Sequence, residues 1–156
     1  MSYKDNTFLS SDLIIMNTLK NTDDEFIKEC NLYYINQSMA SDTTNSIYVG
    51  GVNDTKYHED NDGEGFHNLV NIYINTKNTD YEYGSRWLRT VCEHILNLLY
   101  HNPLLQQRGI KTQSITYDYG TKYNIKGLHL LVRCNEYRPF PKFPDYGVIN
   151  YDKEVE

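Results

Sequence analysis

The stretch "NLVNIYINTKNTDYEYGSRWLRTVCEHILNLL", residues 68–99, decides the fold. In its first third, Val70, Ile72 and Ile74 alternate with Asn71, Tyr73 and other more polar neighbours. An apolar period of two predicts a β-strand over about residues 67–76. One face of this strand is expected to be buried and the other partly wet.

The rest of the stretch predicts a long amphipathic helix over about residues 81–100. Its apolar residues recur at steps of three and four, which places them on one stripe: Trp87, Leu88, Val91, Cys92, Ile95, Leu98 and Leu99. Asp80 is suited to cap the helix start. Asn102-Pro103 is expected to end it, because proline cannot continue the hydrogen-bond ladder.

Downstream, "SITYDYGTKYNIKGLHLLVRCNEY", residues 114–137, predicts an antiparallel hairpin. Two strand-like runs, about 110–119 and 123–137, flank the turn residues Gly120-Thr121. Four residues of the second run are expected to share the buried face: Leu128, Leu130, Val132 and Cys134.

Upstream, the pattern predicts a short N-terminal helix over about 11–20, capped by the hydroxyl of Ser10 or Ser11. Residues 25–34 begin with a capping box, Thr22 with Glu25, yet Leu32–Ile35 favours extended structure. A strand is preferred there over a second helix. Residues 38–45 are expected to be loop, and Ser46–Val49 a short strand that ends in a turn at Gly50-Gly51.

Together these elements predict an α+β fold, in which a mainly antiparallel sheet packs against one long amphipathic helix and a short N-terminal helix. The 156 residues are enough for one domain. Residues 1–137 are expected to form it. Residues 138–156 contain Pro139, Pro141 and Pro144 and are expected to form an extended C-terminal arm.

An acidic loop is predicted at about residues 52–66, carrying Asp54, Glu59, Asp60, Asp62 and Glu64. This stretch does not match an EF-hand calcium loop. With Gly63 or Gly65 at position 6 of that loop, position 12 is Leu69 or Asn71 instead of the bidentate Glu that binds the calcium ion. A solvated loop is the simplest interpretation. A divalent cation held by Asp60, Asp62 and Glu64 is the basis of an alternative hypothesis, a small hydrolase.

Composition excludes several functions. The net charge of −6 disfavours binding to nucleic acid or to an anionic membrane. The apolar runs are too short for a membrane span, and the first residues do not have the pattern of a secretory signal. Three cysteines, Cys30, Cys92 and Cys134, fit no zinc spacing and are expected to be reduced, with the last two in the core.

The remaining motifs predict no catalytic centre. The five histidines, His58, His67, His94, His101 and His129, are scattered without metal-ligand spacing. No nucleophile elbow, Cys–His pattern or phosphate-binding glycine motif occurs. The expectation is therefore a protein that is not an enzyme, with no catalytic residues, no cofactor and no metal.

Tyrosine is abundant, with 15 residues in the chain. Because tyrosine joins a large contact area to a polar hydroxyl, it is enriched at protein contacts. Six tyrosines are expected to cluster around the helix start and the hairpin: Tyr81, Tyr83, Tyr117, Tyr119, Tyr123 and Tyr137. An A/T-rich coding sequence is an equally good explanation of the abundance.

The order of elements, with residues 68–99 and 114–137, resembles the tail terminator (tail-to-head joining) proteins of long-tailed bacteriophages. The resemblance covers roughly residues 8–137 and is one of pattern, so it transfers no functional residues. It implies a homohexameric ring in the neck of a virion, made in the host cytoplasm. The ring would cap the tail tube protein and receive the head-tail connector, with the sheath protein as a further partner.

The acidic composition suits such a ring, because like charge lets DNA pass the lumen without sticking. The hairpin and the C-terminal arm would supply contacts, for example by strand addition to a neighbour. Other hypotheses remain at this point: another neck or head-completion component, the cation-dependent hydrolase, or a small binding partner of a host protein.

Overall fold

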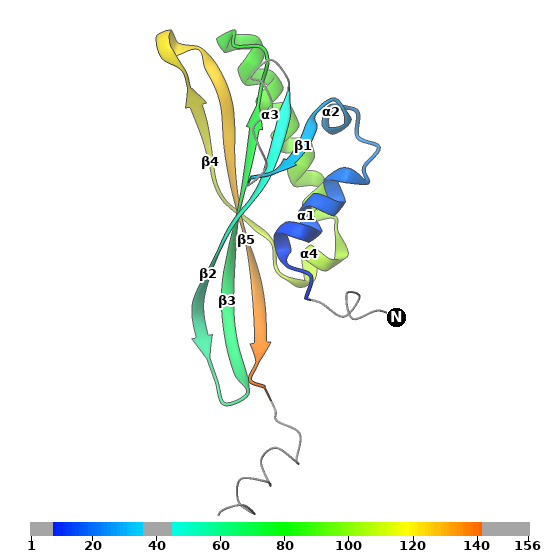
Figure 1. The fold of residues 1–156 in the computed structure, drawn as a ribbon, viewed down its shortest axis with the longest axis vertical. Helices are drawn as coiled ribbons and strands as arrows, with labels where there is room; N and C mark the ends of the chain where they lie inside the picture. Colours follow the sequence, from blue (N-terminus) through cyan, green and yellow to red (C-terminus); the bar gives the residue numbers. More distant parts are fainter. Residues whose placement is uncertain (1–7, 36–44, 142–156) are drawn as a thin grey trace, which may run out of the picture.

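The computed structural model describes residues 8–35 and 45–141 (Figure 1). In chain order they form α1 (Ser11–Lys20), α2 (Glu25–Lys28), β1 (Asn31–Tyr34), β2 (Ser46–Glu59), β3 (Gly63–Asn75), α3 (Tyr81–Tyr100), α4 (Pro103–Gln107), β4 (Lys111–Tyr119), the 3-10 turn η2 (Thr121–Tyr123) and β5 (Ile125–Pro139). The fold is α+β, as expected. None of these helices combines the length and apolar content that crossing a membrane requires.

The strands form one mixed sheet in the order β1-β2-β3-β5-β4. The pairs β2–β3, β3–β5 and β4–β5 are antiparallel, whereas β1–β2 is parallel. The expectation of a mainly antiparallel sheet therefore needs one correction. Since β1 and β2 run in the same direction, no tight hairpin can join them. The intervening residues 36–44, which include most of the predicted loop at 38–45, lie outside the described residues.

The described helices cover one face of the sheet (Figure 1). Strand alternation turns Val70, Ile72 and Ile74 toward them, and all three side chains are fully buried. From β5, Leu128, Leu130, Val132 and Cys134 share this buried face, as predicted. The same core holds Leu88, Val91, Cys92, Ile95 and Leu99 of α3. Hence the stretch 68–99 supplies both layers of the core.

Helix α3 confirms the predicted span, and the carboxylate of Asp80 accepts a hydrogen bond from the Tyr83 N–H (3.0 Å). The helical layer nevertheless contains more than one long and one short helix, because α2 and α4 also form. Asn102-Pro103 ends α3 as expected and also begins α4. The Asn102 side chain caps the N–H groups of Leu104 and Leu105, and proline fits the first turn.

Two expectations about the N-terminal half are wrong. Helix α1 has no hydroxyl cap: Ser10 Oγ donates to the Asp12 carboxylate, and Ser11 Oγ donates to Asn68 (3.2 Å). Residues 25–34 are not one strand, because Asp24 caps a helical turn by accepting from the N–H groups of Phe26 and Ile27. Only Asn31–Tyr34 is extended.

The largest correction concerns the predicted acidic loop at 52–66. Strand β2 does not end at Gly50-Gly51 but continues to Glu59, and β3 begins at Gly63. Gly51 adopts φ +61°, and the register shifts between Gly50 and Asn53, so the chain passes this point as a β-bulge. The acidic residues therefore lie on a long hairpin with a short turn.

The predicted start of the C-terminal arm, at residue 138, is also wrong. Strand β5 continues through Arg138 and Pro139, which pair with Glu64 and Gly63 at the sheet end. Residues 142–156 lie outside the described residues. The β4–β5 connection is likewise longer than Gly120-Thr121, since it runs through η2 to Asn124.

Candidate interaction surface

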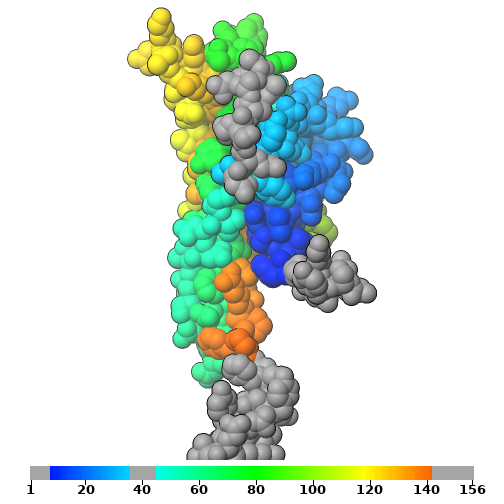
Figure 2. Space-filling view, viewed as in Figure 1, coloured from blue at the N-terminus to red at the C-terminus, as the bar shows by residue number. Residues whose placement is uncertain are grey.

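The sheet extends far beyond the helices at one end (Figures 1 and 2). We call this projection the blade; it consists of residues 53–59 of β2, 63–69 of β3 and 133–139 of β5. All nine residues of β2 from Gly51 to Glu59 are exposed. None of the described helices crosses most of the blade, so within the described residues its faces and the β2 edge are accessible for contact.

The tip of the blade is a closely bonded turn. Asp60 Oδ1 accepts from the N–H groups of Asp62 (2.8 Å) and Gly63 (2.9 Å) and from the Tyr137 hydroxyl (2.9 Å). The Tyr137 hydrogen bond, followed by the backbone bonds, lowers the pKa of Asp60. Desolvation and the neighbouring Asp60 carboxylate raise the pKa of Tyr137 to about 12. The turn therefore holds a charged carboxylate and a neutral phenol together.

A polar network joins the blade to the helices. At its centre Asn68, 3% exposed, donates to Asp54 Oδ1 (2.7 Å) and Glu136 Oε1 (2.9 Å) and accepts from Ser11 of α1. Arg138 donates to both carboxylates, at 2.8 Å to Asp54 and 2.7 Å to Glu136. These bonds hold three strands and one helix in a fixed arrangement.

The charges in this network stabilise one another. The hydrogen bond from Arg138, helped by the one from Asn68, outweighs desolvation and holds the pKa of Glu136 below its usual range. The same contacts with Glu136 and Asp54 raise the pKa of Arg138. The Arg138 guanidinium also lies 4.4 Å from the centre of the Phe66 ring, in a cation–π contact.

The sheet face opposite the helices carries stacked rings. Tyr57 stacks on His67 (4.0 Å between ring centres) and Tyr73 on His129 (4.4 Å). His129 Nε2 donates to Asn71 Oδ1 (2.7 Å), and burial lowers the pKa of this histidine, which favours its neutral form. Tyr57 and Tyr73 remain substantially exposed. This face therefore presents two pairs of stacked aromatic rings, each with an exposed tyrosine.

At the opposite end of the molecule, exposed tyrosines gather where α3 begins and β4 turns into β5 (Figure 1). We call Tyr81, Tyr83, Tyr119 and Tyr123 the tyrosine tip. The rings of Tyr81 and Tyr119 stack (6.1 Å). Lys122 and Tyr123 adopt φ +60° and +62°, a region that L-residues rarely occupy, and Tyr123 is 85% exposed.

The predicted tyrosine cluster is confirmed in part. Tyr117 lies beside the tyrosine tip, 6.4 Å from Tyr119, with its ring packed against the core. Tyr137 is at the other end of the sheet, because it lies 12 residues after Ile125 on β5, a strand of 15 residues. The molecule thus presents separate aromatic surfaces at its two ends.

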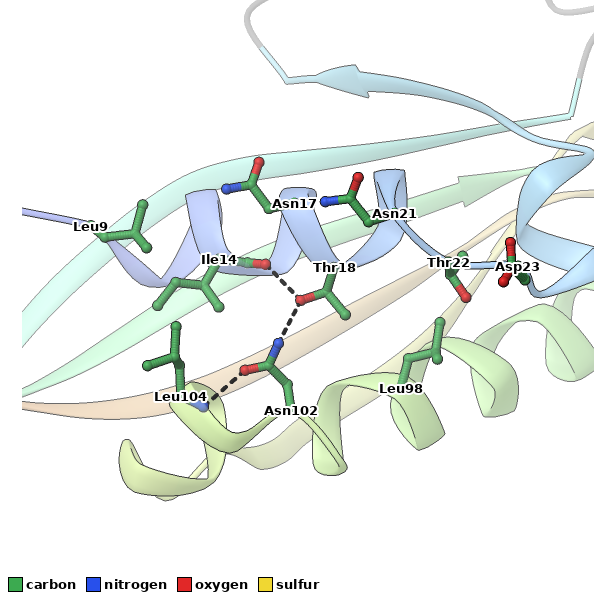
Figure 3. Close-up of a pocket in the computed structure, with 10 residues that line it drawn as sticks. All are labelled: Leu9, Ile14, Asn17, Thr18, Asn21, Thr22, Asp23, Leu98, Asn102 and Leu104. Carbon is green, nitrogen blue, oxygen red and sulfur yellow. Dashed lines mark hydrogen bonds between the residues drawn. The ribbon is translucent and has the colours of Figure 1, made fainter. Parts of the chain in front are cut away.

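A shallow groove runs between α1 and the junction of α3 with α4 (Figure 3). Asn102 Nδ2 donates to Thr18 Oγ1 (2.9 Å), and Thr18 Oγ1 donates to the Ile14 carbonyl (2.8 Å). Among the ten lining residues, Asp23 alone is ionisable. The side chains of Asn102 and Thr18 bond the helices to one another. The groove therefore has few groups that could act in catalysis.

The residues of the hydrolase hypothesis do not converge. The Asp60 carboxylate accepts hydrogen bonds from backbone N–H groups of the turn, and Glu64 forms an ion pair with Lys56 (3.3 Å). Across the described residues, no three His, Cys, Asp or Glu side chains are arranged to hold a metal ion. The three cysteines are buried and free, and burial raises the pKa of Cys30 to about 12 and of Cys92 to about 11.

The five histidines do not form a cluster, and each contacts a different partner in space. They contact Asp60 (His58), Asn135 (His67), Asp24 (His94), the Asn97 carbonyl (His101) and Asn71 (His129). The network around Asn68 was not predicted from the sequence, because the partners of Asn68 lie 14 to 68 residues away from it. No local spacing carries such a signal.

No protein-family model matches the chain, and no curated protein matches it.

Proposed function

We propose that the protein is a structural virion component: a ring-forming tail terminator that caps the tail tube and joins it to the head connector. The observation that carries the proposal is the blade, a part of the sheet that extends beyond the core and is exposed on its β2 edge. An exposed strand edge of this length is a template for pairing with another chain. It suits a protein that assembles.

The two ends of the molecule support this proposal. A closed ring needs two different surfaces on each copy, because each copy contacts one neighbour on either side. A ring that also joins two stacked partners, such as a tube protein and a connector or sheath protein, needs contacts above and below. The blade, the bare sheet face and the tyrosine tip are separate surfaces that can serve these contacts.

Charge is compatible with a DNA passage. The chain carries a net charge of −6, so a ring of copies repels the phosphate backbone and lets DNA slide through. The hydrolase alternative receives no such support, because Asp60, Asp62 and Glu64 do not form a common site. We therefore place the protein in the virion neck, assembled from copies made in the host cytoplasm.

The proposal is tested by the mass of the purified chain and by its effect on tail tubes. Light scattering should give about 110 kDa for six copies of the 18.4-kDa chain. Tubes assembled with the protein should end in an extra ring in electron micrographs. A stable monomer that never joins tube ends would overturn the proposal.

A variant sharpens the test. Tyr123→Ser removes the most exposed ring of the tyrosine tip and leaves the core intact, so folding should be unchanged while joining to a stacked partner weakens. Lys28→Ser, an exposed change on α2, is the matched control and should join normally. If both variants join the stacked partner equally well, the tyrosine tip is not part of that contact.

A further inference from the structure

Among the described residues, the β2 edge of the blade has no neighbouring strand. Strand β1 pairs only with Ser46–Val49, so β2 beyond Gly50 has β3 on one side and no described residue paired on the other. Register shifts occur between Gly50 and Asn53 and between Lys56 and His58. Between them, Asn53–Lys56 is a regular run whose outward backbone groups can pair with an extended segment.

The chain leaves the described fold at the tip of the blade, where β2 also ends. Phe140 N–H donates to the Asp62 carbonyl (2.7 Å), so β5 brings the chain to the turn that ends β2. Residues 142–156 follow, and 15 extended residues can reach roughly 50 Å. The exposed run Gly51–Glu59 is about 30 Å long at the rise of a strand. The segment is long enough to cover it.

The sequence of this segment suits a strand. Twelve residues after Pro144 contain no proline, and Val148, Ile149 and Tyr151 among them have high β-propensity. A proline-free stretch can donate every backbone N–H to a ladder. A segment of this composition is suited to pair with the β2 edge.

The prolines favour a neighbour's edge over the chain's own. Pro139, Pro141 and Pro144 each bias the preceding residue toward an extended conformation. An extended spacer of this kind advances about 3 Å per residue. Since β2 and β5 both run toward the tip of the blade, pairing with the chain's own β2 edge would require a sharp reversal, which an extended proline-containing spacer disfavours.

We propose that residues 145–156 of one copy add as a strand to the β2 edge, at Asn53–Lys56, of a neighbouring copy. This inference rests on the self-assembly in the proposed function. Each copy then donates one strand and accepts one, which is the head-to-tail contact that closes a ring by rotation.

Disulfide trapping between two full-length variants, each with one added cysteine, tests the contact. Thr55→Cys places a thiol on the edge and Asn150→Cys places one on the donated segment. The two chains are co-expressed, one with a larger tag, so that the mixed dimer has its own mass. The native cysteines give little background, since Cys30, Cys92 and Cys134 are buried and burial raises the pKa of each thiol.

Arg86→Cys is the matched control for the edge position, because it is exposed on α3 at the opposite end of the molecule. We expect the Thr55→Cys and Asn150→Cys chains to give a mixed dimer after mild oxidation. The pair of Arg86→Cys and Asn150→Cys should give about tenfold less, because a fixed contact raises the effective thiol concentration. Truncation after Pro144 should convert the assembly to monomers.

Other outcomes separate the inference from the proposed function. A full-length chain that stays monomeric overturns both. An intact ring in the truncated chain, together with no mixed dimer, overturns the strand exchange and leaves the ring-forming function standing. A disulfide formed only within one chain, when a double variant carries both cysteines, also overturns exchange between copies.

Discussion

Replacing Asn68 with alanine should destabilise the protein by about 3 kcal/mol, because this side chain fastens the blade to the core. The change removes two hydrogen bonds to carboxylates, of Asp54 and Glu136, and one to Ser11. Buried bonds to charged groups contribute roughly 1.5–3 kcal/mol each and neutral ones about 1 kcal/mol. The three contributions sum to roughly 4–7 kcal/mol. Arg138 still contacts both carboxylates in the variant and partly compensates for the lost bonds, so the expected destabilisation is smaller than this sum.

The assay is urea unfolding at fixed chain concentration, followed by the fluorescence of Trp87, the only tryptophan. Fixed concentration matters because self-association adds stability by mass action. For a chain of this size, 3 kcal/mol corresponds to a decrease in Tm of roughly 6–12 °C. Ser114→Ala, at an exposed position on β4 of the same sheet, is the control and should change stability by less than about 0.5 kcal/mol.

A second variant at the same position adds a pH signature. Asn68→Asp keeps the shape but places a carboxylate between those of Asp54 and Glu136. Like charges raise the pKa of the new group in the folded state, so the variant should be less stable than Asn68→Ala at pH 7 and recover as the pH falls. A loss below about 1 kcal/mol for Asn68→Ala, or no recovery in acid for Asn68→Asp, would refute the anchoring role.

Three further outcomes follow from the core, the charges and one glycine. Leu88→Ala removes a fully buried side chain of α3 and should cost about 2–5 kcal/mol in urea unfolding. The Arg138 hydrogen bond lowers the pKa of Glu136 in the folded state. This interaction therefore stabilises the fold above the unfolded pKa near 4.5, and the stabilisation is lost as the pH falls below that value. Arg138→Gln should flatten that part of a Tm-against-pH profile. Gly84→Ala should lower Tm, although alanine favours helices, because the new Cβ would lie 2.4 Å from Ile125 Cγ2.

Sequence patterns predicted the parts of the fold that local periodicity determines. Strand β3 and helix α3 were predictable because each has a regular apolar period and the helix has a capping carboxylate at Asp80. The hairpin of β4 and β5 was predictable for the same reason. In these elements the residues that bury against the core are close in sequence, so the signal is local.

The lower part of β2 was not predictable in this way. Its residues Gly51–Glu59 are all exposed, so they carry no apolar alternation, and the glycines resemble a turn. Pairing with β3 forms the strand, through a ladder that depends on backbone groups rather than on side-chain burial. The density of acidic residues therefore led to the prediction of a loop, whereas the chain forms a hairpin.

The candidate site was predictable only at the level of residue type. The abundance of tyrosine indicated contact surfaces, yet only the fold separates Tyr137 from the tyrosine tip. Asn68 has no distinguishing local feature, since its partners come from α1, β2 and β5. Its role follows from register, which the sequence of one strand does not encode.

The continuous pairing of β3 with β5 has a mechanical consequence. These strands are in register over 13 consecutive residue pairs, from Gly63 with Pro139 to Asn75 with Gly127, without a bulge. A pull applied at the blade along the strands loads all of these backbone hydrogen bonds in shear, whereas peeling would break them one after another. The same two strands run from the projecting end into the centre of the core, so tension at one end of the molecule is carried to the other without passing through a loop.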